Sequence, residues 1–342
     1  MPPADPNGPL PGSPLVTRVR LALTASGGVL KYGELVAATS RHAVAVAAEA
    51  GAIARRGSGH YVLRDDTTTA RPAPTSAKSD PASFRDATSR STERAERVRR
   101  HRTIALTNTA VLSHRSAAEY HQLPLLIEPT SAEMIVPPGR RVRSDQRRHS
   151  LIYPRKLAPH EHTDGVTNPL RTVLDCAADL PFAEALAIAD SALRSDDEHP
   201  PLVGREELLI AAGSVRKQAR GQVRLVAELA DGRAANPFES AVRALVHDIP
   251  DLTVTPQCEI DVGDHPIHVD LADRRLRIVL EADSYAWHAD NDAFENDCDR
   301  YNLLTVDGWY VLRLTWKAVM LRPDATRCLI ERLVQRRVSA LT

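Results

Sequence analysis

The sequence has little of several features that would identify a class of protein. Aromatic residues make up only 4% of the 342 residues, so packed cores must consist mainly of Leu, Val and Ala. No segment approaches the about 18 consecutive apolar residues of a membrane-spanning helix. The first residues also lack a basic segment followed by an apolar one. We therefore expect a soluble, cytoplasmic protein with no membrane partner.

Neither sign of charge is in excess. The 44 Lys and Arg residues balance 44 Asp and Glu residues, for a formal net charge of zero. This balance excludes a globally basic surface for nucleic acid, so any such surface must be local. The cysteines lie far apart and form no Cys-x-x-Cys pair, which argues against a zinc ribbon or a redox motif: Cys176, Cys258, Cys298 and Cys328.

The length of the chain predicts two or three domains, because 342 residues exceed the usual size of a single core. We expect an α/β, multi-domain protein that begins with a Pro-rich, disordered tail over residues 1–14. In residues 15–65, three short helices precede two strands around a Gly-Ser-Gly turn, and Ser40 is the expected N-cap of the third helix. Helices followed by a basic hairpin indicate a winged helix-turn-helix domain.

The winged-helix interpretation predicts DNA contacts for five side chains. The third helix would enter the major groove, while the hairpin would lie near phosphates. The residues concerned are Arg41 and His42 on the helix, and Arg55, Arg56 and His60 on the hairpin. Because Ala and Val dominate the helix, a small packing or protein-binding domain is the alternative.

Residues 66–92 have no apolar period and are rich in Thr, Ser, Pro and Ala, so we expect a linker. Residues 93–230 predict an α+β middle domain. Its first helix is strongly basic, which indicates either a solvated face or phosphate contacts. A later helix has Asn168 as its expected N-cap. The histidines of this domain lack the spacing of metal ligands and are expected to be structural: His114, His121, His149, His160 and His162.

Residues 231–342 predict a helix, three strands, a helix, a strand and a final helix. The first helix opens with an N-cap, a first-turn proline and an acid at the third position, which are Asn236, Pro237 and Glu239. The strands "HPIHVDLA" and "RLRIVLEADS" predict an antiparallel hairpin with a tight turn at Arg274 and Arg275.

Three carboxylates of this hairpin share one face in the predicted register. Residue 270 then opposes residue 279, so Glu281 lies diagonally across from Asp270, and Asp283 follows on the same side. Oxygen ligands of this kind suit Mg²⁺ or Mn²⁺, which activates water and neutralises charge on a scissile phosphate. We therefore expect Asp270 and Glu281 to be metal ligands. The alternative is that the acids lie at an exposed end of the sheet.

The order of these motifs resembles a known group. Glu239 on a helix, Asp270 on a strand, "LEAD", Trp287-His288, "F-x-x-D-x-x-R-x-x-x-L" and "GWYVLRLTW" are similar to the domain of unknown function related to very-short-patch repair endonucleases. That group belongs to the PD-(D/E)XK nuclease superfamily, with a restriction-endonuclease-like α/β fold. The resemblance implies that residues 231–342 form this domain.

By position, the resemblance implies catalytic roles for several side chains. Asp270 and Glu281 match the metal-binding acids, Glu239 the accessory acid of the helix, and His288 the histidine that follows Trp. Asp283 stands where the superfamily pattern often has Lys. Without that Lys, the remaining candidate to orient water or contact the phosphate is His288.

The first half carries a separate resemblance. "GGVLKYGELVAATSRHAVAVAAEAGAIARRGSGHYVL" is similar to the winged-helix N-terminus of AbiEi-type antitoxins from type IV toxin-antitoxin systems, and "LSHRSAAEYHQLP" and "NPLRTVLDCAADLP" resemble their following domain. This likeness implies DNA binding, and a nucleotidyltransferase-like toxin as partner.

Two classes of function follow from the sequence. In the first, the protein is a DNA endonuclease that hydrolyses phosphodiesters with Mg²⁺ or Mn²⁺ and is targeted by its winged helix. In the second, it is a DNA-binding antitoxin or transcriptional autoregulator whose nuclease fold is inactive.

Overall fold

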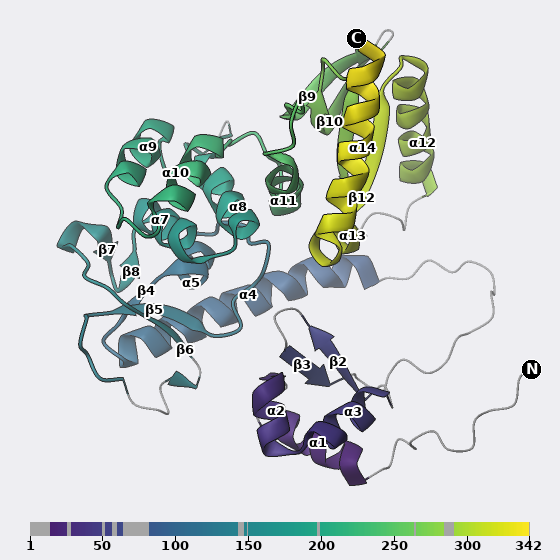
Figure 1. The fold of residues 1–342 in the computed structure, drawn as a ribbon. Coiled ribbons are helices and arrows are strands. Elements are labelled where there is room, and N and C mark those ends of the chain that lie inside the picture. The colour runs from purple at the N-terminus through teal and green to yellow at the C-terminus, as the bar shows by residue number, and fades with distance from the viewer. Residues whose placement is uncertain are drawn as a thin grey trace, which may run out of the picture. The chain divides into compact units, whose positions relative to one another are not determined.

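The computed structural model describes residues 14–25, 29–49, 52–56, 60–63, 82–142, 147–148, 150–196, 199–262, 265–283 and 291–341. The chain forms two compact units, residues 1–78 and 79–342, and each is considered by itself. Both combine helices with a sheet, as expected for a multi-domain α/β protein (Figure 1). No helix of the described residues combines the length and the apolar character that crossing a membrane requires.

The first unit contains three helices and a three-stranded sheet. The elements are α1 (Pro14–Ala25), β1 (Val29–Lys31), α2 (Tyr32–Ala38), α3 (Arg41–Glu49), β2 (Ile53–Arg56) and β3 (His60–Leu63). The sheet is antiparallel in the order β1-β3-β2. Ser40 caps α3, because its Oγ accepts a hydrogen bond from the Ala43 amide at 3.0 Å. Strand β1 was absent from the sequence-based expectation.

A small apolar core holds the first unit together. Helices α1, α2 and α3 each bury one stripe, and strand β2 closes the cluster: Val16, Val19, Leu23, Leu35, Ala43, Val44, Ala47, Ala52 and Ile53. Ala43, Val44 and Ala47 of α3 therefore belong to the core, whereas Arg41, Ala45 and Ala48 are exposed.

Helix α4 (Ala82–Thr107) begins inside the segment 66–92 that was expected to be a linker. Helix propensity does not require an apolar period, so the lack of a period in that segment did not exclude a helix. The boundary between the two compact units, after Lys78, lies in the same segment.

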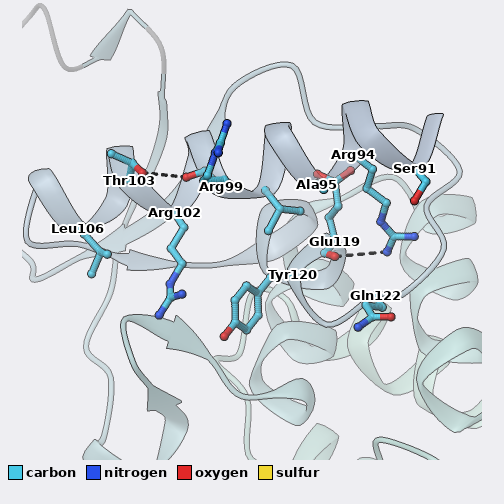
Figure 2. A pocket seen from close by; sticks show the side chains of 11 residues that line it. Ser91, Arg94, Ala95, Arg99, Arg102, Thr103, Leu106, Glu119, Tyr120 and Gln122 are labelled. Atoms are coloured by element: carbon cyan, nitrogen blue, oxygen red, sulfur yellow. Dashed lines mark hydrogen bonds between the residues drawn. The ribbon is translucent and has the colours of Figure 1, made fainter. Parts of the chain in front are cut away.

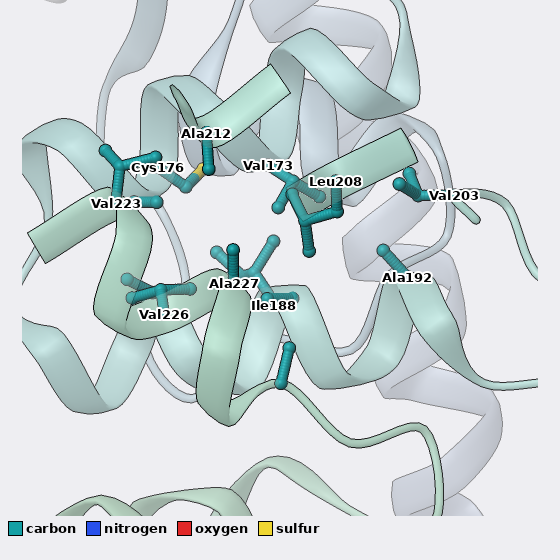
Figure 3. Packing of buried hydrophobic residues seen from close by; sticks show 14 of the residues in the cluster. Val173, Cys176, Ile188, Ala192, Val203, Leu208, Ala212, Val223, Val226 and Ala227 are labelled. Atoms are coloured by element: carbon teal, nitrogen blue, oxygen red, sulfur yellow. The ribbon is translucent and has the colours of Figure 1, made fainter. Parts of the chain in front are cut away.

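The remaining elements up to residue 230 form a five-stranded sheet and a group of helices. They are β4 (Val111–Leu112), α5 (His114–Tyr120), β5 (Ala132–Val136), β6 (Ser150–Pro154), the 3₁₀ helix η1 (Pro159–Glu161), β7 (His162–Thr163), β8 (Val166–Thr167), α7 (Pro169–Asp179), α8 (Phe182–Leu193), α9 (Arg205–Gly213) and α10 (Arg220–Leu229). The sheet order is β6-β5-β4-β8-β7. Figure 3 shows the helical core, in which small residues such as Ala192, Ala212 and Ala227 allow close approach.

The last part of the chain has one four-stranded sheet in the order β12-β11-β10-β9. Its elements are α11 (Pro237–Val246), β9 (Thr255–Val262), β10 (His265–Asp273), β11 (Ile278–Asp283), α12 (Asn291–Val306), β12 (Tyr310–Thr315), α13 (Trp316–Leu321) and α14 (Pro323–Leu341). One face packs on α11, α13 and α14, and the other packs on α12. Strand β12 runs parallel to β11, whereas the other neighbours are antiparallel.

The middle and last parts share apolar packing. Leu126 and Ala187 belong to the same buried cluster as Phe238 and Val242 of α11. A buried ion pair between Asp190 of α8 and Arg243 of α11 joins the same two helices at 2.6 Å. The two parts are therefore held together by a common core. The domain boundary expected between residues 230 and 231 stays a prediction.

Candidate functional site

The acidic hairpin has a different register from the expected one. Leu271 pairs with Leu280, and Asp273 with Ile278, whereas the expected register would pair Leu271 with Ile278; the paired residues end at Leu271. The turn is longer than expected, because Asp273 accepts a hydrogen bond from the Leu276 amide at 2.8 Å and closes a wider loop. Asp270 nevertheless lies close to Glu281, because its carboxylate accepts a hydrogen bond from the amide of Ala282, the residue after Glu281.

The sheet is irregular at Asp270. Val269 and Leu271 pack in different clusters on opposite faces, although residues two apart on a regular strand share a face. On the neighbouring strand, Gln257 lies between the partners of these two residues and has φ 48°, a left-handed conformation that is uncommon for a residue with a side chain. Such local departures from regular strand geometry change the direction of side chains, and here they occur at a carboxylate in the middle of a sheet.

Asp270 and Glu281 form an electrostatically coupled pair. Asp270 accepts a hydrogen bond from the Ala282 amide at 2.7 Å. Glu281 is buried, and this burial, together with the nearby charge of Asp270, raises the pKa of Glu281 to about 7. The Arg300 guanidinium of α12 donates to Glu281 and opposes part of that rise.

Glu239 approaches Asp270 from α11. Its carboxylate accepts hydrogen bonds from the Ala235 amide at 2.8 Å and from the Gln257 side chain at 2.9 Å. The Asn236 amide group caps the helix and also donates to Glu239 at 2.6 Å. Burial and the charge of Asp270 nevertheless raise the pKa of Glu239 to about 7. Glu239 is therefore both a capping residue and a member of the acidic site.

Asp283 is neutralised by an arginine. Arg313 of β12 forms an ion pair with Asp283 at 2.7 Å and lies 3.6 Å from Asp297 of α12. The guanidinium groups of Arg300 and Arg313 both lie over the Tyr301 ring, at 5.2 and 4.9 Å from its centroid. Arg313 thus supplies positive charge beside Asp283, and Arg300 supplies it beside Glu281.

Asp270 and Glu281 are candidate ligands for a hard divalent cation, and Arg300 already donates to Glu281. Mg²⁺ is bound in proteins by one or two carboxylates together with water, and Asp270 and Glu281 supply two. The mutual repulsion that raises the pKa of Glu281 is the interaction that a cation relieves. Glu239 is affected by the charge of Asp270 and accepts a hydrogen bond from Gln257, so we assign it to the surroundings of the pair.

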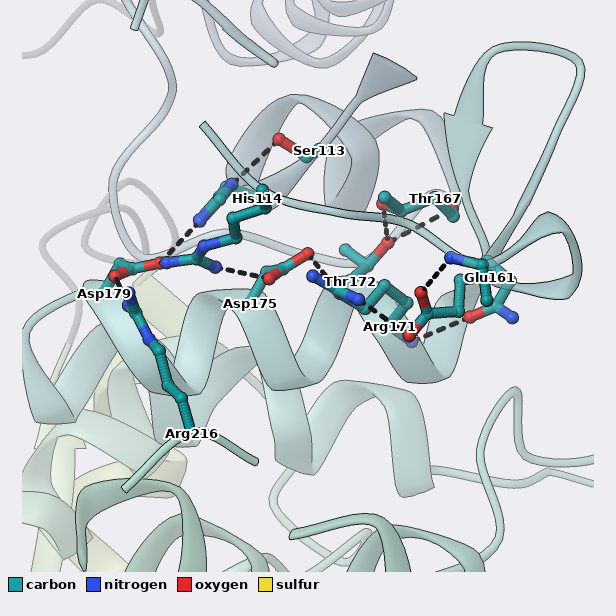
Figure 4. A network of polar contacts seen from close by, with 12 residues as sticks. Ser113, His114, Glu161, Thr167, Arg171, Thr172, Asp175, Asp179 and Arg216 are labelled. Carbon is teal, nitrogen blue, oxygen red and sulfur yellow. Dashed lines mark hydrogen bonds and ion pairs between the residues drawn. The ribbon is translucent and has the colours of Figure 1, made fainter. Parts of the chain in front are cut away.

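A second group of possible metal ligands lies in the middle part. Among the described residues, His114, Asp175 and Asp179 bring three ligand atoms within 4.8 Å of one another. Arginines already form ion pairs with these acids. Arg155 binds both aspartates. Arg171 binds Asp175 at 2.8 Å and Glu161 at 2.7 Å, and Arg216 binds Asp179 at 2.6 Å (Figure 4). Three guanidinium groups therefore match three carboxylates.

His114 fits this network as a structural residue. Its ring accepts or donates hydrogen bonds at both nitrogens, to Ser113 Oγ and to Asp179 Oδ2, each at 2.9 Å. The ring also stacks on Tyr153 with centroids 3.6 Å apart. Although burial opposes it, hydrogen bonds from His114 and Arg155 lower the pKa of Asp179 to about 2. A cation would have to displace arginines here, so this network is a poor metal site.

Some predicted site residues fall outside what the structure describes. His288 lies in the segment 284–290, outside the described residues. The backbones of His42, Arg55, Arg56 and His60 belong to α3, β2 and β3, but their side chains are outside the described part of the chain. Arg41 is exposed at the start of α3.

Three side chains of the site were missed by sequence reasoning. Gln257 is one of several polar residues in the strand "TPQCEIDV", and the alternation does not distinguish it from Glu259 and Asp261. Arg300 was noticed only as part of a motif, and Arg313 only as part of a strand. Their ion pairs with Glu281 and Asp283 join residues of different elements, so spacing along the chain could not reveal them.

No protein-family model matches the sequence. Two curated proteins are similar to it at 28% identity over 218 residues, which is 61% of this chain and 76% of theirs. They are the uncharacterized protein MT2308 of Mycobacterium tuberculosis strain CDC 1551 / Oshkosh and the uncharacterized protein Rv2248 of strain ATCC 25618 / H37Rv. The crystal structure of the RV2827C protein of Mycobacterium tuberculosis matches 75% of this chain and 88% of that chain, at 14% identity and a TM-score of 0.24. A TM-score of this size does not indicate a shared fold.

Proposed function

We propose that the protein is a DNA-binding phosphodiester hydrolase with a PD-(D/E)XK-like endonuclease site on β10 and β11, targeted to duplex DNA by a winged helix in residues 15–65. The observation that carries this proposal is the pair of neighbouring carboxylates, Asp270 and Glu281. The pKa of Glu281 is raised to about 7 by burial and by its neighbour. Buried acids that repel one another are found where a protein binds cations or transfers protons.

Asp270 and Glu281 would hold Mg²⁺ or Mn²⁺, and such an ion supplies an activated water molecule and neutralises charge on the phosphate. Glu239, with a pKa near 7, can accept or release a proton close to Asp270 at neutral pH. Arg300 and Arg313 provide positive charge for the phosphate, a role that Lys has in the superfamily. His288 is the further candidate for contact with the water or the phosphate.

The winged-helix part of the proposal rests on the first unit. Three helices followed by an antiparallel pair, with Arg41 exposed at the start of α3, are the arrangement in which α3 enters a major groove. Ala43, Val44 and Ala47 of α3 pack in the core, whereas Ala45 and Ala48 are exposed and would lie with Arg41 on the side of α3 that meets the DNA.

Nicking of supercoiled plasmid by the full chain tests the proposal. The parent should nick only with millimolar Mg²⁺ or Mn²⁺, and Asp270→Asn and Glu281→Gln should remove the activity. Glu259→Gln is the matched control, because Glu259 is an exposed carboxylate on the neighbouring strand β9 and should leave nicking unchanged. His288→Ala should lower the rate while metal binding remains. Nicking that persists in both site variants would show that the carboxylate pair is not the catalytic site.

A second function is favoured by the arginine partners of the site. Glu281 and Asp283 each already have a guanidinium partner, and Asp283 replaces the usual Lys. An inactive nuclease fold in a DNA-binding antitoxin or autoregulator, with a nucleotidyltransferase-like toxin as partner, would have this feature. A metal-dependent rise in melting temperature without any nicking would support this alternative over the endonuclease.

A further inference from the structure

A basic groove lies on α4, away from the carboxylate pair. Its volume is about 740 Å³, within the range of pockets that hold small ligands. Three arginines of α4 line it, together with Tyr120 of α5 and Gln122 just after that helix (Figure 2). None of these residues takes part in the proposed hydrolysis or in the winged helix.

The acid in the wall of this groove is already neutralised. Glu119 is buried and forms an ion pair at 2.5 Å with Arg97, which also binds Glu128 at 3.0 Å. Arg94 donates to the carbonyl oxygens of Glu119 and Leu123, at 3.3 and 3.4 Å. In the part of the chain that the structure describes, the side chains of Arg94, Arg99 and Arg102 have no carboxylate partner. The groove therefore has an excess of positive charge that an anionic ligand would complete.

The surroundings of Arg102 also bear on ligand binding. Its Nε atom is buried and finds no hydrogen-bond partner among the described residues. Because this atom is enclosed, a ligand in the groove would meet Arg102 at the outer end of its guanidinium group. The Arg102 guanidinium also lies 5.5 Å from the centroid of the Tyr120 ring, and Figure 2 shows the two side chains next to each other. A guanidinium group that can bind a phosphate thus lies next to an aromatic ring on which a base can stack.

We propose that the α4 groove, lined by Arg94, Arg99, Arg102 and Tyr120, binds a short segment of single-stranded nucleic acid. Arg99 and Arg102 contact phosphates, and a base stacks on the Tyr120 ring. Single-stranded nucleic acid is bound by this combination of positive groove and aromatic ring. A duplex would satisfy the arginines, but its bases are stacked inside the helix and cannot reach Tyr120. An acidic peptide likewise offers the ring no planar partner.

Fluorescence anisotropy with the full chain tests this site. A labelled thymidine oligonucleotide and a labelled hairpin duplex, closed by a flexible linker without bases so that it offers no unpaired base, are titrated in EDTA so that no hydrolysis occurs. Combined Arg99→Gln and Arg102→Gln should weaken single-strand binding about tenfold, and should reduce the slope of log K against log salt by about 0.7 for each phosphate that the variant no longer neutralises. The control variant combines Arg332→Gln with Arg336→Gln, at two exposed arginines of α14, and so removes the same charge elsewhere. It should leave the single-strand affinity and the salt slope unchanged.

Tyr120 separates stacking from charge. Tyr120→Leu should weaken single-strand binding about fivefold or more while the salt slope stays the same, because the variant removes a stacking partner and no charge. Tyr120→Phe keeps the ring and should bind as the parent does, which guards against an effect of misfolding. Unchanged single-strand affinity in the double arginine variant would overturn the proposal. Equal losses on strand and hairpin, or equal losses for Tyr120→Leu and Tyr120→Phe, would also overturn it.

The hairpin duplex makes this result independent of the proposed function. If the parent does not bind the hairpin, the winged-helix role fails, while the single-strand measurements still decide the α4 groove. If the parent binds the hairpin and the α4 variants bind both ligands as the parent does, the winged helix stands and the groove proposal is wrong.

Discussion

Arg243 of α11 donates to both carboxylate oxygens of Asp190 of α8, each at 2.6 Å, in a buried position one helical turn after Glu239. The same aspartate accepts the Asp231 amide at 2.8 Å, and Arg243 also donates to the Leu229 carbonyl at 2.6 Å. The ion pair therefore fixes the helix that carries Glu239 against the middle part of the chain.

Removing one partner of this pair should be strongly destabilising. Arg243→Met leaves the buried Asp190 without its cation, so the free energy of unfolding should fall by about 3 to 5 kcal/mol. Combined with Asp190→Leu, the loss should be smaller than the sum of the two single losses, because the double variant leaves no uncompensated charge. Urea denaturation of the four proteins measures this coupling. Additive losses would show that the two side chains do not stabilise each other.

Arg300 and a divalent cation should compete for Glu281. The guanidinium donates to a carboxylate oxygen of Glu281 that a metal ion would also use. Arg300→Gln should therefore lower the Mn²⁺ concentration at half-maximal rise of the melting temperature by about tenfold, equivalent to about 1.4 kcal/mol. Arg332→Gln, at an exposed position of α14, should leave that concentration unchanged. Weaker Mn²⁺ binding in Arg300→Gln would mean that Arg300 positions Glu281 rather than blocking it.

Glu281 should make stability depend on pH. Its folded-state pKa is raised from 4.5 to about 7, so the folded protein keeps this proton longer than the unfolded chain does. The contribution of this proton to the free energy of unfolding is present in full below pH 4.5 and is lost as the pH rises to about 7. Glu281→Gln mimics the protonated form and should gain stability relative to the parent across this window, by on the order of 1 to 3 kcal/mol.

The comparison of variant with parent isolates Glu281 from other groups. Burial lowers the pKa of His101 to about 4, so His101 titrates in an overlapping range with the opposite sign, and the difference between the two proteins cancels it. Urea midpoints in EDTA from pH 4.5 to pH 8 give the measurement. A difference that is constant with pH would contradict a raised pKa at Glu281.

Arg41 should contribute to duplex binding through phosphate contact. It is exposed at the start of α3, so Arg41→Gln should reduce the slope of log K against log salt by about 0.9, the value for one phosphate of duplex DNA. Mobility shifts of a duplex at several salt concentrations give the slope. Arg224→Gln, an exposed position of α10, is the control for charge alone. An unchanged slope for Arg41→Gln would remove α3 from the DNA contact.

The sequence alone determined the features that depend on neighbours within a few residues. The caps of α3 and α11, Ser40 and Asn236, were predicted from their spacing to the helix, and each makes the expected hydrogen bonds. Asn168 likewise caps α7. Asp270 and Glu281 were expected to lie close together in a hairpin, and Asp270 does accept a hydrogen bond from the amide next to Glu281, although the register differs from the expected one by two residues.

Only the tertiary structure decided how those elements meet. The register of the hairpin depends on the turn closed by Asp273, and the left-handed Gln257 depends on a neighbouring strand. The arginine partners of Glu281 and Asp283 come from α12 and β12. For residues so far apart in the chain, spacing along the sequence does not predict the distance between their side chains. Periodicity and capping are local hydrogen-bonding properties of the backbone, whereas ion pairs and pKa values arise from the packing of elements that are distant in the chain.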